Sequence, residues 1–197
     1  MESKLFTPVT FGPLTLRNRT IRSAAFESMC PGNAPSDMLL DYHRSVAAGG
    51  IGMTTVAYAA VTQSGLSFDR QLWMRPEIIP GLRRLTDAIH AEGAAAGIQL
   101  GHCGNMSHKS ICGCMPVGAS SGFNLYSPTF VRGLRADELP EMARAYGRSV
   151  NLAREAGFDS VEIHAGHGYL ISQFLSPSTN HRKDEFGGSL QNRMRFM

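Results

Sequence analysis

The sequence contains no long apolar segment, few cysteines and no strong excess of charge of either sign. No run approaches the ~18 consecutive apolar residues of a membrane-spanning helix, and the opening residues, MESKLFTPVTFGPL, contain no apolar core of a secretion signal. Four cysteines are too few for a disulfide scaffold. A net charge of +3 is too small to indicate nucleic-acid binding. These absences predict a reduced, cytoplasmic protein with no nucleic-acid or membrane partner.

Strand-like and helix-like segments alternate along the chain. After a hairpin at residues 10–22, segments rich in β-branched or alternating apolar residues are followed by segments in which apolar residues recur every three or four positions. The predicted strands are 20–25, 52–61, 95–101 and 159–165. The predicted helices are 36–49, 76–92 and 137–156, with a fourth starting at Ser189 and a long loop over 102–135. This order predicts a parallel sheet with helical crossovers.

Two architectures fit such alternation, a doubly wound sheet and a (β/α)8 TIM barrel. A nucleotide-binding doubly wound sheet would favour a G-x-G-x-x-G turn after the first strand, and the sequence has neither this turn nor a phosphate-loop motif. A barrel needs eight strand-helix units and about 250 residues. Residues 1–197 are therefore predicted to form a single α/β domain, the N-terminal half of a barrel with about the first four units.

The fourth predicted strand ends in a segment dense in polar chemistry, HAGHGYLISQF. Alternation along the strand directs Glu162 and His164 into the barrel, with Val161 and Ile163 facing the helices. His164 stands at the carboxyl end of the strand, where barrel active sites lie. The imidazoles of His164 and His167 and the phenol of Tyr169 could donate hydrogen bonds to one developing oxyanion, and one of the three groups could deliver a proton. Loop histidines bonded to backbone are the alternative, and zinc is disfavoured because no Glu follows His164 as in H-E-x-x-H.

The predicted third loop, HCGNMSHKSICGC, carries histidine and cysteine but lacks the C-x2-C spacing of a zinc site. Thiols without a metal are the favoured interpretation. Gln99 faces inward by alternation in the third predicted strand, and a buried amide needs hydrogen-bond partners. Either a bound heterocycle or a neighbouring strand could supply them.

Three segments carry a resemblance to a known family. HAGHGYLISQFLSPSTNHRKDEFGGSLQNRMRF resembles the signature of the old yellow enzyme family of FMN-dependent NADH:flavin oxidoreductases and ene-reductases. LFTPVTFGPLTLRNRTIRSA and GIQLGHCG match the same family in the expected order. The resemblance spans essentially the whole chain and implies a TIM barrel that holds FMN at its carboxyl rim.

The resemblance also implies an activity and roles for individual residues. NADH or NADPH would reduce FMN, which would then reduce the activated C=C bond of an α,β-unsaturated carbonyl compound. His164 and His167 match the pair that binds the substrate's carbonyl oxygen, and Tyr169 matches the proton donor. The residues that match flavin contacts are Ala24, Ala25, Tyr58 and Gln99.

The chain departs from the family pattern at two points. Ala25-Phe26 stand where many members have Cys or Thr, and Asn105 stands where an Arg often follows Gly104. The later strands that carry the flavin phosphate in the family are not in this sequence. A non-catalytic half-barrel that self-associates, or binds a partner through open strand edges, is therefore the alternative function.

Overall fold

The computed structural model describes residues 3–197 and contains two compact units, which are described separately. The first unit comprises the chain up to Ala59, Arg70–Gln99 and Val150–Glu162. The second comprises Ala60–Asp69, Leu100–Ser149 and Ile163–Met197. Each unit is assembled from segments that lie far apart in the sequence.

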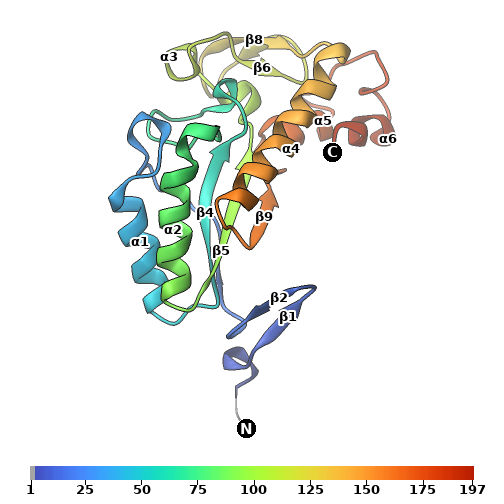
Figure 1. The fold of residues 1–197 in the computed structure, drawn as a ribbon. Helices are drawn as coiled ribbons and strands as arrows, with labels where there is room; N and C mark the ends of the chain where they lie inside the picture. Colours follow the sequence, from blue (N-terminus) through green and yellow to red (C-terminus); the bar gives the residue numbers. More distant parts are fainter. Residues whose placement is uncertain (1–2) are drawn as a thin grey trace. The chain divides into compact units, whose positions relative to one another are not determined.

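The first unit is built on parallel strands covered by helices (Figure 1). Within this unit an antiparallel hairpin, β1 (Val9–Phe11) and β2 (Leu14–Leu16), precedes the main sheet in the sequence. The main sheet has the order β3-β4-β5-β9, formed by β3 (Ile21–Arg22), β4 (Met53–Ala60), β5 (Ala95–Gly101) and β9 (Ser160–Ile163). The unit's helices are α1 (Asp37–Ala48) and α2 (Ile79–Ala91). Helix α4 (Leu139–Glu155) belongs to the first unit from Val150 onward and to the second unit before it.

The main sheet is parallel and sequential, as the alternating pattern predicts. Ile21 pairs with Met53 in parallel register. At one end of β4 and β5, Ala95 N–H donates to Gly52 O at 2.9 Å, and at the other end Val61 N–H donates to Gly101 O at 3.0 Å. The two strands therefore run in the same direction. Asp159 N–H likewise donates to Ala96 O at 2.8 Å as β9 begins. The predicted order of four parallel strands is confirmed.

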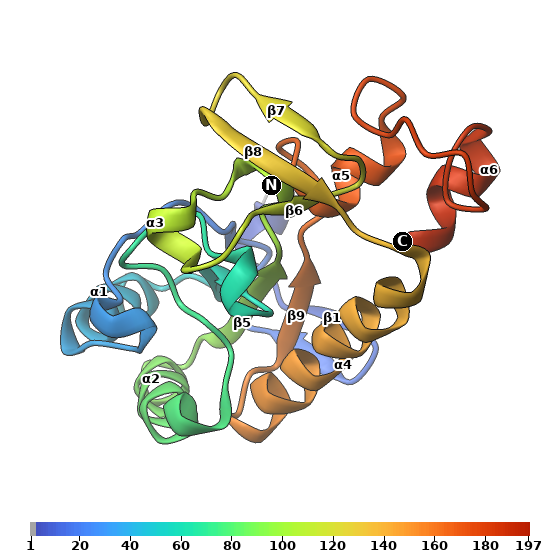
Figure 2. The same cartoon turned by 90° about the horizontal axis from the view of Figure 1, so that it is seen from above.

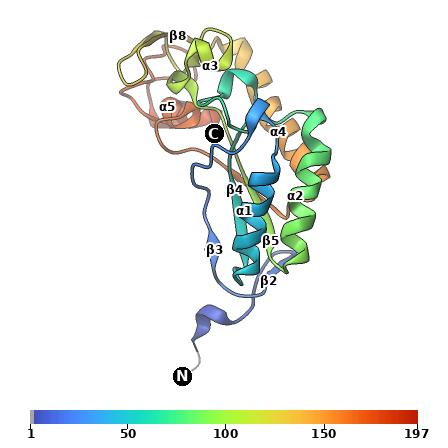
Figure 3. The ribbon, with the colours of Figure 1, turned by 90° about the vertical axis from the view of Figure 1, so that its left-hand side faces the viewer.

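Helices α1 and α2 lie beside each other on the outer side of β4 and β5 (Figures 2 and 3). Ser36 caps α1 by accepting a hydrogen bond from Leu39 N–H at 3.2 Å, which satisfies one of the unpaired donors of the first turn. The apolar stripe of α2 is fully buried at Leu82, Leu85 and Ile89. These side chains fix the helix against the sheet, because burial of each contributes roughly 1.5–3 kcal/mol.

A buried ionic cluster ties the end of β3 to its neighbours in the first unit. The Glu27 side chain is 5% exposed and lies 3.0 Å from the Arg22 guanidinium. Its carboxylate also lies 2.9 Å from Nε2 of the fully buried His43 and accepts a hydrogen bond from Ala57 N–H at 3.2 Å. Nδ1 of His43 lies 2.8 Å from Thr54 Oγ1. Strand β4, helix α1 and the segment after β3 therefore share one carboxylate.

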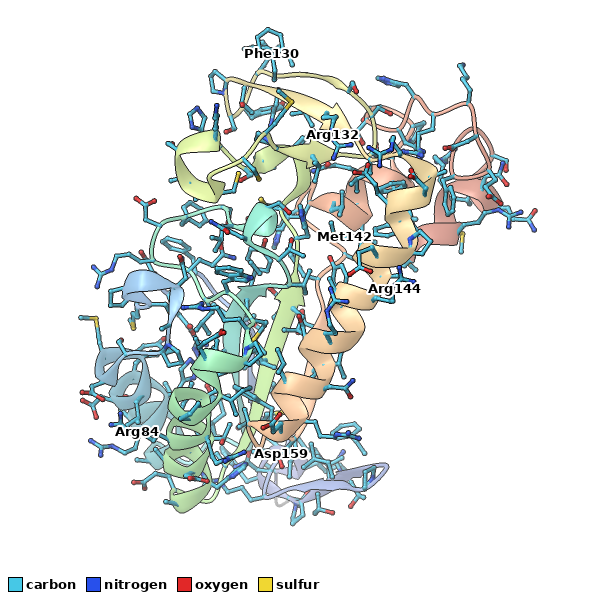
Figure 4. The ribbon with its side chains drawn as sticks, turned by 45° about the horizontal axis from the view of Figure 1, so that its top comes forward. Arg84, Phe130, Arg132, Met142, Arg144 and Asp159 are labelled. Carbon is cyan, nitrogen blue, oxygen red and sulfur yellow. The ribbon has the colours of Figure 1, made fainter. Side chains whose placement is uncertain are left out.

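The second unit contains structure that the sequence pattern did not predict. The predicted loop over 102–135 includes α3 (Lys109–Cys112) and a small sheet of order β6-β8-β7, formed by β6 (Val117–Gly118), β7 (Gly122–Asn124) and β8 (Thr129–Gly133). Phe130 projects outward from this sheet (Figure 4), and Arg132 pairs with Glu138 at 2.7 Å. The interpretation of the whole segment as loop was wrong, because strands this short carry too little periodicity to be recognised.

Two further elements in the second unit follow β9. Helix α5 (Leu170–Leu175) lies in a segment for which no helix was predicted. Helix α6 (Leu190–Arg193) begins after Ser189, the predicted helix start, whose hydroxyl accepts from Asn192 N–H at 3.2 Å. Ile163 was expected to face a helix, but it is 44% exposed. The reason is that β9 is the last strand in the sheet order and has a neighbour on one side alone among the described residues.

His102 is a fully buried histidine at the end of β5, and its two ring nitrogens have different roles. Nδ1 accepts a hydrogen bond from Gly104 N–H at 2.9 Å, so the proton of the neutral ring sits on Nε2, 3.0 Å from Ser64 Oγ. Burial lowers the pKa of His102 to about 3. The folded state therefore holds this ring neutral through most of the acid range.

The network around Glu27 predicts a large loss of stability when its carboxylate is removed. Glu27→Ala would remove the carboxylate that pairs with Arg22, whose side chain is 15% exposed, and with the buried His43, and breaking a buried pair costs about 3–5 kcal/mol. The control is Asp41→Ala, which removes an exposed pair with Arg44 and should cost about 0–1 kcal/mol. Urea denaturation measures both, and equal losses would contradict the assignment.

His102 predicts a pH dependence of stability. Its folded pKa lies below the unfolded value, so the unfolded state binds the extra proton. The free energy of unfolding should therefore fall as pH drops below about 6.5, towards the folded pKa of about 3. His102→Asn, which retains an acceptor, should show a shallower decline in this window. Denaturation across pH compares the two, and parallel curves would show that His102 does not titrate as described.

Candidate functional site

The three predicted catalytic residues lie together in the second unit, directly after β9. His164 is held by its backbone, whose N–H donates to Leu100 O at 2.8 Å, and its side chain is buried. The chain then turns, with Tyr169 N–H donating to Gly166 O at 3.1 Å and Leu170 N–H to His102 O at 2.9 Å. Tyr169 is the N-terminal cap residue of α5. A strand end, a tight turn and a helix start therefore fix the cluster.

His167 occupies an uncommon backbone conformation. Its φ is 55°, in the left-handed region that non-glycine residues seldom adopt, and it is followed by Gly168 with φ 69°. Such a conformation costs on the order of 1 kcal/mol or more and persists where the surroundings impose it. In return, the turn directs the His167 ring back towards His164.

The aromatic rings of the cluster are in direct contact. Nδ1 of His167 lies 3.0 Å from Nε2 of His164, so one nitrogen donates and the other accepts. The His164 and Tyr169 rings meet edge to face with centroids 5.1 Å apart. A ligand oxygen that accepts a hydrogen bond from either histidine at these nitrogens would replace the bond between the two rings. The cluster thus offers two imidazole donors and a phenol within one short segment.

Tyr169 is half-buried and stays protonated. Burial raises the pKa of its phenol, and a hydrogen bond with Ser67 acts in the opposite direction. A neutral phenol is a proton donor, whereas a phenolate is not. The environment therefore maintains Tyr169 in the form that a general acid requires.

Gln173 is a positioning residue that the sequence analysis did not identify. Its side chain is 1% exposed, and its Nε2 lies within hydrogen-bond distance of the oxygens of Gly168 at 2.6 Å and Cys103 at 3.2 Å. Its Oε1 accepts from Asn105 N–H at 3.1 Å. One amide therefore joins the segment after β5 to the turn that carries His167. The signal available in the sequence was a glutamine four residues after Tyr169, on the buried face of α5.

Gly104 shows how closely the two segments approach. A Cβ at this position would lie 2.4 Å from Oε1 of Gln173, and the φ of Gly104 is 63°. Any side chain here would displace the amide. Gly104 is therefore required by both its conformation and its neighbour.

A pocket of about 500 Å³ lies against the turn of His167 and Gly168 within the second unit. Its size suits a small-molecule ligand. Aromatic and apolar side chains and a few amide and hydroxyl groups line it, from Asn105, Met106, Phe123, Asn124, Leu125, Tyr126, His167, Gly168 and Thr179. The β7–β8 hairpin was not predicted, so the lining residues that it supplies, Phe123, Asn124, Leu125 and Tyr126, were missed.

The four predicted flavin contacts belong to the first unit. Gln99 is 9% exposed, and its Nε2 donates to Glu162 Oε1 at 2.6 Å, so a neighbouring strand satisfies this donor. Ala24 and Ala25 follow β3 and present small side chains, and the Tyr58 carbonyl accepts from Gln71 Nε2 at 3.1 Å. A buried amide and the small side chains that follow β3 are group types that suit the polar edge and the flat face of a flavin ring.

The cysteine and histidine residues of the segment after β5 do not form a metal centre. Within residues 3–197, no group of three or more metal-ligating side chains comes together. Cys103 instead donates to Leu66 O at 3.4 Å, and His102 is committed to Ser64 and Gly104. In the same described range, no helix is long and apolar enough to cross a membrane.

Comparisons with known proteins agree with the geometry. The family model of the NADH:flavin oxidoreductase / NADH oxidase family matches residues 4–197. The chain is 42% identical over 192 residues to a 4,4'-dithiodibutanoate disulfide reductase of Rhodococcus erythropolis, covering 98% of the chain and 48% of that relative. It is 37% identical over 202 residues to an NADPH dehydrogenase of Bacillus subtilis, covering 100% of the chain and 58% of the relative.

Solved structures confirm the predicted barrel architecture. An old yellow enzyme homologue from Zymomonas mobilis superposes with a TM-score of 0.91 at 30% identity, over 98% of this chain and 57% of that one. Morphinone reductase in complex with tetrahydroNAD gives 0.92 at 29% identity, over 99% and 58%. The chain thus spans about half the length of these relatives and corresponds to part of their α/β barrel. With a model match over nearly its full length, the chain belongs to the NADH:flavin oxidoreductase / NADH oxidase family.

Proposed function

We propose that the protein carrying this chain is an FMN-dependent oxidoreductase that uses NADH or NADPH to reduce the activated C=C bond of α,β-unsaturated carbonyl compounds. We also propose that residues 1–197 belong to one barrel domain. The observation that carries the proposal is the contact of His164, His167 and a protonated Tyr169 beside a pocket of about 500 Å³. Family membership supports the flavin and nicotinamide chemistry.

The two histidines would bind and polarise the substrate carbonyl. Addition of hydride to the β-carbon of an enone builds negative charge on the oxygen, and FMN, when bound, supplies that hydride. Donors aimed at this oxygen stabilise the transition state more than the neutral substrate. His164 is fixed by its backbone bond to Leu100, and His167 by its turn, so little reorganisation precedes the reaction.

Tyr169 would donate a proton to the α-carbon. The burial that raises its pKa keeps the phenol neutral, and the hydrogen bond with Ser67 orients its hydroxyl. Gln173 would act through the turn: its amide holds Gly168 and thereby the residues on either side. The β7–β8 hairpin would contribute apolar lining from Phe123 and so favour substrates with a flat, uncharged body.

Gln99, Ala24, Ala25 and Tyr58 would hold the flavin ring. The Gln99 amide could address the polar edge of the ring, and Glu162 would orient that amide from the adjacent strand. Small side chains at Ala24 and Ala25 let the backbone approach the ring. Phe26, 68% exposed, stands where many relatives carry Cys or Thr, so a side-chain polar contact common in the family is missing at that position.

A disulfide is the second candidate substrate, because the relative at 42% identity bears the name of a disulfide reductase. The same histidines could stabilise a departing thiolate. A thiolate needs no proton donor to leave, since thiol pKa values lie near 8.5. The role of Tyr169 therefore separates the two substrate classes.

Tyr169→Phe should slow reoxidation of the reduced enzyme by an enone about 10²–10⁴-fold, the usual contribution of a general acid. Reduction of the flavin by NADH or NADPH should be nearly unchanged, because the phenol acts after hydride transfer to the substrate. Stopped-flow absorbance measures the two half-reactions separately. Tyr42→Phe, on α1 outside the catalytic segment, is the matched control.

The result of this experiment discriminates between the candidates. Loss confined to enone reoxidation supports C=C reduction. Unchanged enone reoxidation would show that another group delivers the proton. If a disulfide reoxidises both the wild-type protein and Tyr169→Phe faster than any enone does, the second candidate replaces the first.

His164→Ala and His167→Ala should each weaken binding of phenolic ligands and slow reoxidation by an enone, with a loss of about 2–4 kcal/mol in transition-state stabilisation. The effects should be less than additive, because the two rings bond to each other. The control is His181→Ala, an exposed histidine in the same segment. Ligand titration and stopped-flow kinetics test this, and full additivity would argue against a shared oxygen-binding site.

A further inference from the structure

Two cysteines in the second unit lie side by side outside the catalytic cluster. Helix α3 ends at Cys112, and Gly113, with φ 73°, turns the chain so that Cys114 returns towards the helix end. The two Sγ atoms are 3.6 Å apart, and Cys112 Sγ also approaches the Cys114 carbonyl at 3.2 Å. The C-G-C spacing and the left-handed glycine together create this pair.

The two thiols differ sharply in their access to solvent. Cys112 is 1% exposed, whereas Cys114 is exposed. The other two cysteines, Cys30 and Cys103, are both buried. Cys114 is therefore the thiol that a reagent in solution reaches first, and Cys112 is placed to attack Cys114 from within the protein.

We propose that Cys112 and Cys114 form a redox-active dithiol, which closes to an intramolecular disulfide by exchange with a low-molecular-weight disulfide of the glutathione type. The Cys114 thiolate attacks one sulfur of the small disulfide, forming a mixed disulfide and releasing one thiol. The Cys112 thiolate then attacks Cys114 Sγ, forms the Cys112–Cys114 bond and releases the second thiol. Two protein thiols are oxidised, one small disulfide is reduced, and both thiol protons pass to the released thiols.

The geometry favours closure without a large rearrangement. The sulfur atoms must approach from 3.6 Å to about 2.05 Å. Gly113 lies between them, and a Cβ there would meet no atom nearer than Gln63 Nε2 at 3.4 Å, so the turn has room to adjust. Glycine also permits the positive φ of residue 113 in both the dithiol and the disulfide form.

The disulfide so formed is readily reversible. It encloses one intervening residue, so it gains little from restriction of the unfolded chain. Strained or exposed disulfides have more oxidising potentials than structural ones and belong to the labile or regulatory class. Burial, with the hydrogen bond to Cys112, raises the pKa of Cys114 to about 11, so exchange is slow at neutral pH and faster as the pH rises.

The test is thiol mapping of the purified, fully reduced protein after incubation with oxidised glutathione at mildly alkaline pH. Trypsin releases Ser110–Arg132, which contains Cys112 and Cys114 and no other cysteine. After alkylation, mass spectrometry should show this peptide without any alkyl group and lighter than the unalkylated dithiol peptide by two hydrogen atoms. Reduced glutathione should restore both thiols. The measurement requires neither flavin nor enzymatic activity, so it is independent of the proposed function.

Single variants separate the two steps. Cys112→Ser should accumulate the glutathione mixed disulfide on Cys114, because the resolving thiol is gone. Cys114→Ser should keep Cys112 as a buried thiol. Cys103, in the peptide Leu85–Lys109, and Cys30 serve as internal controls and should remain alkylatable only after unfolding.

Three outcomes would overturn the proposal. The first is a stable mixed disulfide on Cys114 of the wild-type protein, which would show that Cys112 does not resolve it. The second is Cys114 of Cys112→Ser remaining a thiol, which would show that the exposed sulfur does not exchange. The third is a disulfide that links two protein chains in place of the intramolecular bond.

Discussion

The buried amide of Gln173 is the interaction on which the segment from His164 to Tyr169 depends. A buried amide must satisfy both its donors and its acceptor, and Gln173 does so with backbone and side-chain groups of two separate loops. One of these loops follows β5 and the other follows β9. Because the amide bonds to both, each loop can keep its conformation only while the other keeps its own. Loss of either set of partners would leave polar groups unpaired in an apolar site, at a cost of about 1–3 kcal/mol per group.

The same coupling explains why a strained residue is tolerated at the centre of the cluster. His167 adopts its left-handed conformation between two glycines, and Gly168 is held by Gln173. The strain is local, whereas the hydrogen bonds and the burial of α5 through Leu170, Ile171 and Phe174 are cooperative. The rings of His164, His167 and Tyr169 are therefore ordered by the buried amide of Gln173 and by the apolar side chains of α5.

In the first unit, a carboxylate plays a comparable part. Glu27 accepts from strand β4 and faces Arg22 and the buried His43, which fixes the segment that follows β3. That segment carries Ala24 and Ala25, the proposed neighbours of the flavin ring. Both units thus use one buried polar group to fix the loop at the end of a strand. The dithiol of Cys112 and Cys114 belongs to neither network, which allows it to change its oxidation state independently.

Local pattern was sufficient for the long elements. The stripe of Leu82, Leu85 and Ile89 predicted α2, Ser36 predicted the start of α1, and the alternation of β5 predicted that Gln99 is buried. Parallel pairing followed from the order of these elements, because sequential strands joined by helices pair in parallel. His164, His167 and Tyr169 were predicted as site residues from their types and their place after a strand, where a barrel places its chemistry, and the structure brings their rings into contact.

Tertiary structure alone decided the partners of the buried polar groups and the short elements. Gln99 bonds to Glu162, His102 is held neutral between Ser64 and Gly104, and the small sheet of β6, β7 and β8 lines the pocket. The contacts of Gln99 with Glu162 and of His102 with Ser64 join residues 63 and 38 positions apart, and strands of two to five residues have no periodicity to read. The sequence by itself determined the buried face of α2 and the strand order of the main sheet, because those depend on repeating local patterns. Which buried group meets which partner depended on how distant segments pack.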